Sequence, residues 1–279
     1  MMASSSAQGQ DLAIKLRKER GLANSPISSL AQLEDLAACD VVVADMPDGV
    51  DGLTLRDPQT GNILIGVATS TSPFRQRFTL AHEIGHIVAG DVSTSTNIHE
   101  CTPKSPEETR AHSFARNLLC PVDGVKAVSD RLLGNISKAE MLSRVVRMFQ
   151  VSPEVAAYQL KAAKLVTAAD VEELKKHTAT ALAARWGWIN EYNGCVDLAN
   201  TPHVSPRLIE DVTAAYLEGH VTIGSLAFVR GDTIEDTKAD MDLVEKEALK
   251  TAEPNHISQD QDDCTEASRE RFLADFFGS

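Results

Sequence analysis

Three residues with a clear capacity for chemistry, His82, Glu83 and His86, stand in the pattern His-Glu-x-x-His. Side chains four residues apart lie on one face of an α-helix, so His82 and His86 can direct two imidazoles at one metal ion. Glu83 flanks that position, and its carboxylate can take a proton from a water molecule whose pKa a zinc ion has lowered towards ~7. The hydroxide so formed can attack a peptide carbonyl. The pattern therefore predicts a zinc-dependent hydrolytic site with Glu83 as the base.

The same pattern also arises by chance on amphipathic helices, so its surroundings decide its weight. An apolar stripe at helical spacing runs through it, consisting of Phe74, Phe78, Ala81, Ile84 and Val88. Because the stripe and the pattern share one predicted helix, which ends at Gly90, we interpret the pattern as a metal site.

A catalytic zinc site usually has a third protein ligand and leaves one position for water. The metzincin pattern would require glycine three and histidine six residues after His86, where Ala89 and Val92 stand, so that class is excluded. The alternative is a carboxylate from the following helix, at whose start Glu107 and Glu108 lie.

Glu108 has two interpretations. Ser105-Pro106-Glu107-Glu108 has the form of a capping box, in which the glutamate returns a hydrogen bond to the serine N–H. Spacing alone leaves capping and metal ligation equally open. His112 lies one turn after Glu108 and is a candidate fourth ligand or transition-state hydrogen-bond donor; its plain alternative is a partly buried polar residue.

Hydrophobic periodicity predicts the elements that must position these residues. The predicted helices cover residues 11–38 with a break near residue 25, 73–89, 105–120, 137–149 and 153–164. Short extended segments at residues 41–44, 52–56 and 62–67 predict a small sheet with at least one hairpin. The predicted fold class is α+β and mainly helical.

The chain is predicted to have three parts. Residues 1–167 hold the metal site, residues 168–236 form a small helical domain with Trp186 and Trp188 as core anchors, and residues 237–279 form an acidic, flexible tail.

Composition limits the function further. No apolar run approaches the ~20 residues of a membrane helix, and the N-terminus lacks the features of a secretory signal, which favours a cytoplasmic protein away from the membrane. Five scattered cysteines without a CxxC pair favour reduced thiols. The net charge is -13, and the segment from Asp232 onward carries 14 acidic and 5 basic residues. An acidic chain without a basic stripe disfavours direct nucleic-acid binding and favours a protein partner.

Two motifs in this order resemble the ImmA/IrrE family of metallopeptidases. They are Gln76-Arg77-Phe78-Thr79-Leu80-Ala81-His82-Glu83-Ile84-Gly85-His86 and Glu108-x-x-Ala111-x-x-Phe114-Ala115-x-x-Leu118-Leu119-x-Pro121. Phe149-Gln150-Val151-Ser152-Pro153 is similar to the family's later helix pair, and the resemblance covers residues 40–166.

The resemblance implies a zincin-like metallopeptidase domain in which His82, His86 and Glu108 are the zinc ligands and Glu83 is the catalytic base. Mn²⁺ and Fe²⁺ are the alternative native ions. It also implies that the strand at residues 62–67, with Ile63, Leu64 and Ile65, is an edge strand that holds an extended substrate by β-addition.

The sequence departs from the family at three places. His112 and Cys120 stand where asparagine is usual and methionine is frequent, and the short N-terminal segment contains no clear helix-turn-helix domain.

Family members similar to this chain cleave a helix-turn-helix repressor of the XRE type. The resemblance therefore implies a site-specific endopeptidase that derepresses stress-response or mobile-element genes. The alternative hypothesis is a non-proteolytic anti-repressor or signalling adaptor with a structural metal site. The sequence specifies neither the activating signal nor the oligomeric state.

Overall fold

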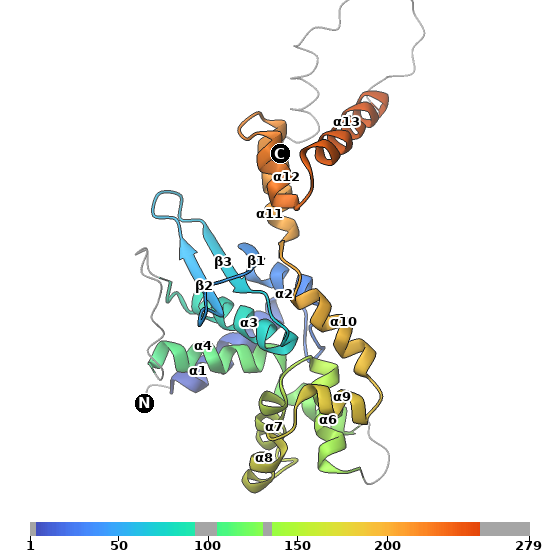
Figure 1. The fold of residues 1–279 in the computed structure, drawn as a ribbon. Coiled ribbons are helices and arrows are strands. Elements are labelled where there is room, and N and C mark those ends of the chain that lie inside the picture. Colours follow the sequence, from blue (N-terminus) through green and yellow to red (C-terminus); the bar gives the residue numbers. More distant parts are fainter. Residues whose placement is uncertain (1–3, 93–104, 131–135, 252–279) are drawn as a thin grey trace, which may run out of the picture. The chain divides into compact units, whose positions relative to one another are not determined.

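The computed structural model describes residues 4–92, 105–130 and 136–251 (Figure 1). Contacts divide the chain into two compact units, Met1–Arg207 and Leu208–Ser279. The predicted boundary at residue 167 therefore lies inside the first unit, because residues 168–207 share the core of the residues before them.

Helices dominate both units, which confirms the predicted fold class. Those of the first unit are α1 (Ser5–Glu19), α2 (Leu30–Ala37), α3 (Pro73–Ala89), α4 (Pro106–Leu119), α5 (Val122–Asp130), α6 (Lys138–Phe149), α7 (Pro153–Ala162), α8 (Ala168–Leu174), α9 (Ala179–Arg185) and α10 (Ile189–Ala199). Local signals start many of them: the side chains of Ser4, Ser105, Ser137, Ser152 and Thr167 each accept a backbone N–H as N-caps.

A four-stranded sheet lies beside these helices, with strands β1 (Asp40–Ala44), β2 (Gly52–Arg56), β3 (Ile63–Ala68) and β4 (His203–Val204). The strand order is β2-β3-β1-β4; β1 and β3 are parallel, and the other pairs are antiparallel. The predicted hairpin joins β2 to β3. In its turn, Asp57 O accepts the Gly61 N–H at 2.8 Å, and Gly61 has a φ of 76°, which favours glycine.

The expectation that Ile63, Leu64 and Ile65 form an edge strand is wrong. β3 is paired on both sides, with Leu64 opposite Asp40 on β1 and Leu55 on β2. Because β1 pairs with β3, the first strand of the hairpin, β2, lies on the outside. The edge of the sheet on that side is therefore β2.

One core joins the sheet to the helices. Val41 and Val43 of β1, with Ile65 and Val67 of β3, are at most 1% exposed and belong to the same cluster as Leu80 of α3. α3 contacts β2, β3 and α4, and α1 packs along α4 (Figure 1). The site-bearing helix is thus held on both sides.

Trp188 belongs to this core and not to a separate domain. It is 3% exposed, and its Nε1–H donates to Ser143 Oγ at 2.9 Å. Nearby, the ring of Tyr192 meets that of Phe74 edge-on at 5.4 Å between centroids, which attaches α10 to the start of α3. Trp186 is only half-buried and stacks with Arg185.

The second unit is helical. α11 (Pro206–Leu217) leads into it, and α12 (Ile223–Arg230) and α13 (Ile234–Thr251) contact each other. Leu226, Ala227, Thr237 and Met241 are its buried residues among those described. The predicted flexible tail is helical from residue 237 to residue 251, and its remainder lies outside the described residues. Within the described ranges, no helix has both the length and the apolar character needed to cross a bilayer.

Candidate metal centre

Helix α3 positions three of the predicted site residues. Pro73 starts the helix, and Gly90 ends it with a φ of 76°. Leu80, Ala81 and Ile84 are fully buried and fix the rotation of the helix about its axis. The imidazoles of His82 and His86, one turn apart, therefore point towards the start of α4.

Helix α4 approaches α3 closely because residue 85 is glycine. A Cβ at Gly85 would lie 3.0 Å from Phe114 Cδ1 and 3.1 Å from Ala111 Cα, closer than ordinary packing allows. This contact places the first turn of α4, with Glu108, opposite the two imidazoles.

Three side chains with potential ligand atoms converge at this point. His82 Nε2 lies 3.0 Å from Glu108 Oε2, His86 Nε2 lies 3.2 Å from Glu108 Oε1, and the two Nε2 atoms are 3.1 Å apart. Ligands at ~2.0–2.1 Å from a tetrahedral zinc ion would be about 3.3 Å apart, so the three groups are spaced to hold such an ion. The side chains are 14–18% exposed. The arrangement is a half-buried site with two nitrogen ligands and one oxygen ligand.

The surroundings of His82 favour the neutral form of its imidazole, which is the form that binds a metal ion. Burial, followed by the neighbouring His86, lowers the pKa of His82 to about 4. The ring is therefore neutral near pH 7, and a neutral imidazole has the lone pair that a metal ion needs.

Glu108 takes part in the cap of α4 through its backbone alone, and its side chain is left to face the metal site. Its backbone N–H donates to Ser105 Oγ at 3.2 Å, which caps α4. Its carboxylate faces the imidazoles, while the neighbouring Glu107 is exposed. Capping and ligation are therefore compatible.

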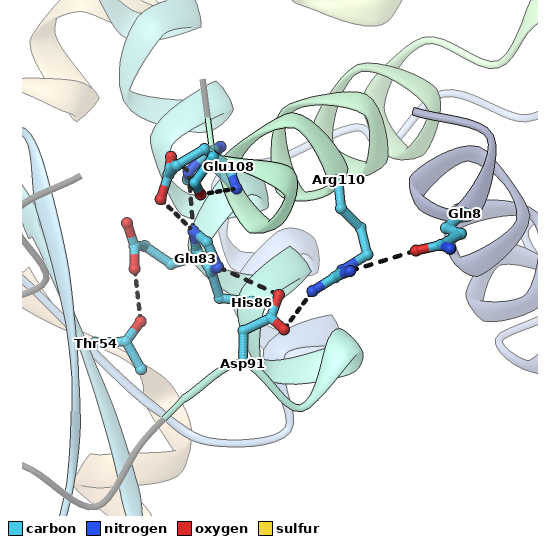
Figure 2. A network of polar contacts seen from close by, with 9 residues as sticks. Gln8, Thr54, Glu83, His86, Asp91, Glu108 and Arg110 are labelled. Atoms are coloured by element: carbon cyan, nitrogen blue, oxygen red, sulfur yellow. Dashed lines mark hydrogen bonds and ion pairs between the residues drawn. The ribbon is translucent and has the colours of Figure 1, made fainter. Parts of the chain in front are cut away.

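Glu83 lies beside the three candidate ligands, and a residue of the sheet holds its carboxylate by a hydrogen bond. Thr54 Oγ1, on the edge strand β2, donates to Glu83 Oε2 at 2.7 Å (Figure 2). Glu83 is 9% exposed. Sequence reasoning missed Thr54, and no local signal could have found it, because the contact depends on β2 lying at the edge next to α3.

His112 is placed near the site but outside the group of converging ligand atoms. Its side chain is exposed, which differs from the alternative interpretation of His112 as a partly buried polar residue. Its ring centroid is 6.4 Å from that of His82 and 4.8 Å from that of Phe78.

Known proteins resemble the part of the chain that forms this site. Residues 37–161 match the family described as the IrrE N-terminal-like domain, a peptidase family. The radiation response metalloprotease IrrE of Deinococcus radiodurans is 32% identical over 152 residues, which cover 47% of this chain and 45% of the relative. The chain thus spans less than half the length of this curated relative. The matched range includes all the site residues described above but not α1.

Proposed function

We propose that this chain is a metal-dependent endopeptidase, since residues 37–161 match the IrrE N-terminal-like family of peptidases. The convergence of His82, His86 and Glu108 next to Glu83 carries the proposal. Zinc is the ion that we assign, since two imidazoles and one carboxylate with these separations suit it.

In this proposal, His82, His86 and Glu108 hold the ion, which when bound supplies Lewis acidity towards water and the peptide carbonyl. Glu83 moves the protons. Its carboxylate accepts a proton from the attacking water and delivers it to the amine that leaves. The hydrogen bond from Thr54 keeps the carboxylate beside the reacting water.

The edge strand β2 suits an extended substrate. It lies against α3, and Thr54 on this strand contacts the base directly. A peptide that adds to β2 would pass the metal site with its backbone aligned by main-chain hydrogen bonds.

We further propose that the substrate is a helix-turn-helix repressor of the XRE type, whose cleavage derepresses stress-response or mobile-element genes. The net charge of -13 supports a protein partner over a nucleic acid. The relative from Deinococcus radiodurans is described as a radiation response protease, which supports a stress response. The described cysteines Cys39, Cys120 and Cys195 are free thiols, which supports a reducing compartment such as the cytoplasm.

The decisive test compares Glu83→Gln with Glu107→Gln. The zinc-loaded proteins are incubated with the XRE-type repressor encoded nearest to this gene, and fragments are followed by mass spectrometry. Glu83→Gln is expected to retain its zinc and to lose about 10²–10⁴-fold in cleavage rate, because it lacks the base. Glu107→Gln changes an exposed neighbour and is expected to cleave as the wild type does.

Two outcomes contradict the proposal. Cleavage by Glu83→Gln at the wild-type rate would remove the base from the mechanism. Inactivation of the repressor without fragments, equally by the wild type and by Glu83→Gln, would indicate an adaptor that sequesters its partner.

A further inference from the structure

A line of polar contacts leads from His86 away from the ligand cluster to helix α1 (Figure 2). His86 Nδ1 lies 3.7 Å from Asp91 Oδ2. Asp91 Oδ1 accepts from Arg110 Nη2 at 2.5 Å, and Arg110 Nη1 donates to Gln8 Oε1 at 3.3 Å. The side chains of Asp91 and Arg110 are 13% and 18% exposed, so water screens this line only weakly.

The first contact acts on the ring of a metal ligand. His86 directs Nε2 at His82 and Glu108, so Nδ1 is the nitrogen left to carry the proton of a neutral ligating imidazole. Asp91 Oδ2 is buried and makes no hydrogen bond to a described residue, and it faces Nδ1 of the His86 ring. A carboxylate that faces the second nitrogen of a ligating histidine, here at an ion-pair distance of 3.7 Å, orients the ring and increases its basicity.

The backbone holds Asp91 in place for this contact. The Asp91 N–H donates to His86 O at 2.9 Å, and the preceding Gly90 adopts the left-handed conformation that ends α3. The carboxylate is therefore attached to the same turn of helix as the ring that it faces.

Arg110 connects this carboxylate to the helix that supplies the third ligand. It lies on α4 two residues after Glu108, so α4 contributes Glu108 to the ligand cluster and Arg110 to the far side of His86. A charge-assisted pair between two half-buried groups holds its geometry better than an exposed pair.

Helix α1 fits α4 closely at Arg110. A Cβ at Gly9 would lie 2.1 Å from Arg110 O and 2.9 Å from Phe114 N, so only glycine allows this approach. Next to it, Ser113 Oγ donates to Ser6 O at 2.6 Å. Gln8 thus reaches Arg110 from a helix that lies outside the matched residues 37–161.

We propose that Asp91, Arg110 and Gln8 are positioning residues that orient His86 for the metal, so that α1 forms part of the support of the metal centre. The inference rests on the metal site of the proposed function, although not on its substrate. Asp91 acts through His86, and Arg110 and Gln8 act through Asp91.

The test measures the affinity of the full chain for Zn²⁺ by competition with a chromophoric chelator. Asp91→Asn keeps the shape of the side chain but removes its charge, and is expected to weaken zinc binding about 10–100-fold. Arg110→Gln is expected to weaken zinc binding by a factor in the same range. Gln8→Ala is expected to weaken zinc binding less. Gln8→Glu keeps an acceptor for Arg110 and is expected to bind as the wild type does. Asp123→Asn, which removes the carboxylate of an exposed ion pair with Lys126, is the matched control and is expected to have no effect.

Two further readouts separate positioning from a general loss of structure. Saturating Co²⁺ is expected to give Asp91→Asn a shifted visible spectrum, because the spectrum reports the geometry of the ligands. When His86 is already replaced by alanine, adding Asp91→Asn is expected to cause no further loss of zinc affinity. The substitution at Asp91 acts through the His86 ring, which this variant lacks.

Wild-type zinc affinity in both Asp91→Asn and Arg110→Gln would overturn the inference and leave the proposed metal site intact. An undiminished loss in the His86→Ala background would also overturn it, and wild-type affinity in Gln8→Ala would remove α1 from the support. A wild-type protein that binds no zinc would contradict the inference and the proposed function together. A protein that shows the predicted affinities but cleaves no repressor would support the inference and contradict only the substrate.

Discussion

At the scale of the residue, the candidate metal centre places two adjacent glutamates in different surroundings. Successive residues of a helix point about 100° apart, so Glu107 faces outwards while Glu108 meets the two histidines. The backbone N–H of Glu108 makes the capping contact with Ser105, so the cap does not use the carboxylate.

Replacing each glutamate in turn tests this division. Glu108→Gln is expected to reduce zinc affinity at least about 100-fold, because an amide is a poor zinc ligand, and to leave the cap intact. Glu107→Gln is expected to bind zinc as the wild type does. Metal content after dialysis, together with competition against a chelator, measures both. Equal affinities for the two variants would show that Glu108 only caps its helix.

At the scale of the element, the distance between α3 and α4 decides whether Glu108 reaches the histidines. Gly85 sets that distance by allowing Ala111 and Phe114 against the backbone of α3. On the other side of α4, Gly9 allows α1 to approach in the same way. α4 is thus enclosed between two helices at glycines, and its register follows from both contacts.

Gly85→Ala tests the first contact. The added methyl group would overpack the crossing and is expected to lower the free energy of unfolding by about 1–3 kcal/mol. Gly194→Ala is the matched control, since Gly194 lies inside α10 with nothing within 4 Å of an added Cβ. There the change is expected to stabilise the protein by roughly 0.5–1 kcal/mol through helix propensity. Urea unfolding of both metal-free variants gives the comparison, and a Gly85→Ala protein as stable as Gly194→Ala would refute the close crossing.

At the scale of the whole molecule, the first unit extends beyond the matched family domain at both ends. α1 precedes the domain and packs on α4. After the domain, Gln76 Nε2 of α3 donates to Ala199 O at 2.8 Å, and β4 adds to β1. The second unit, Leu208–Ser279, encloses its own small core.

An ion pair at β4, between the buried Glu34 and the partly exposed His203, makes the stability of the first unit depend on pH. His203 directs Nε2 at Glu34 Oε1, 2.9 Å away, and Nδ1 at Thr201 O, 3.0 Å away, so both nitrogens face acceptors and the ring is held as an imidazolium. The hydrogen bond with Glu34 is the main cause that raises the pKa of His203 above its ordinary value. At the start of β1, Asp40 Oδ1 and Arg207 Nε lie 3.7 Å apart.

The sign of the pH dependence follows from the raised pKa. The pair's contribution is complete below the unfolded value of about 6.5 and is lost as pH rises through the higher folded value. We therefore expect the difference in unfolding free energy between the wild type and His203→Gln to decrease from pH 6 to pH 9, measured by urea unfolding. In a Glu34→Gln background the same substitution should show no such trend. A difference that is constant with pH would mean that His203 is not held as a cation.

Short-range patterns in the sequence were sufficient for the local part of the site. The His-Glu-x-x-His spacing, the capping serines and the turn at residues 57–61 act over a few residues, so α3, α4 and the β2–β3 hairpin were predicted correctly. A resemblance to the metallopeptidase family was also recognisable from two motifs, and residues 37–161 match that family.

Only the tertiary structure decided what depends on elements that are distant in sequence. It showed that β2 and not β3 is the edge strand, that Thr54 holds Glu83, and that residues 168–207 belong to the first unit. It also showed that the carboxylate of Glu108 faces the histidines. It further showed that Asp91, Arg110 and Gln8 connect His86 to α1. Strand order and helix crossings are set by which surfaces bury each other best, and periodicity along one segment carries no information about its partner.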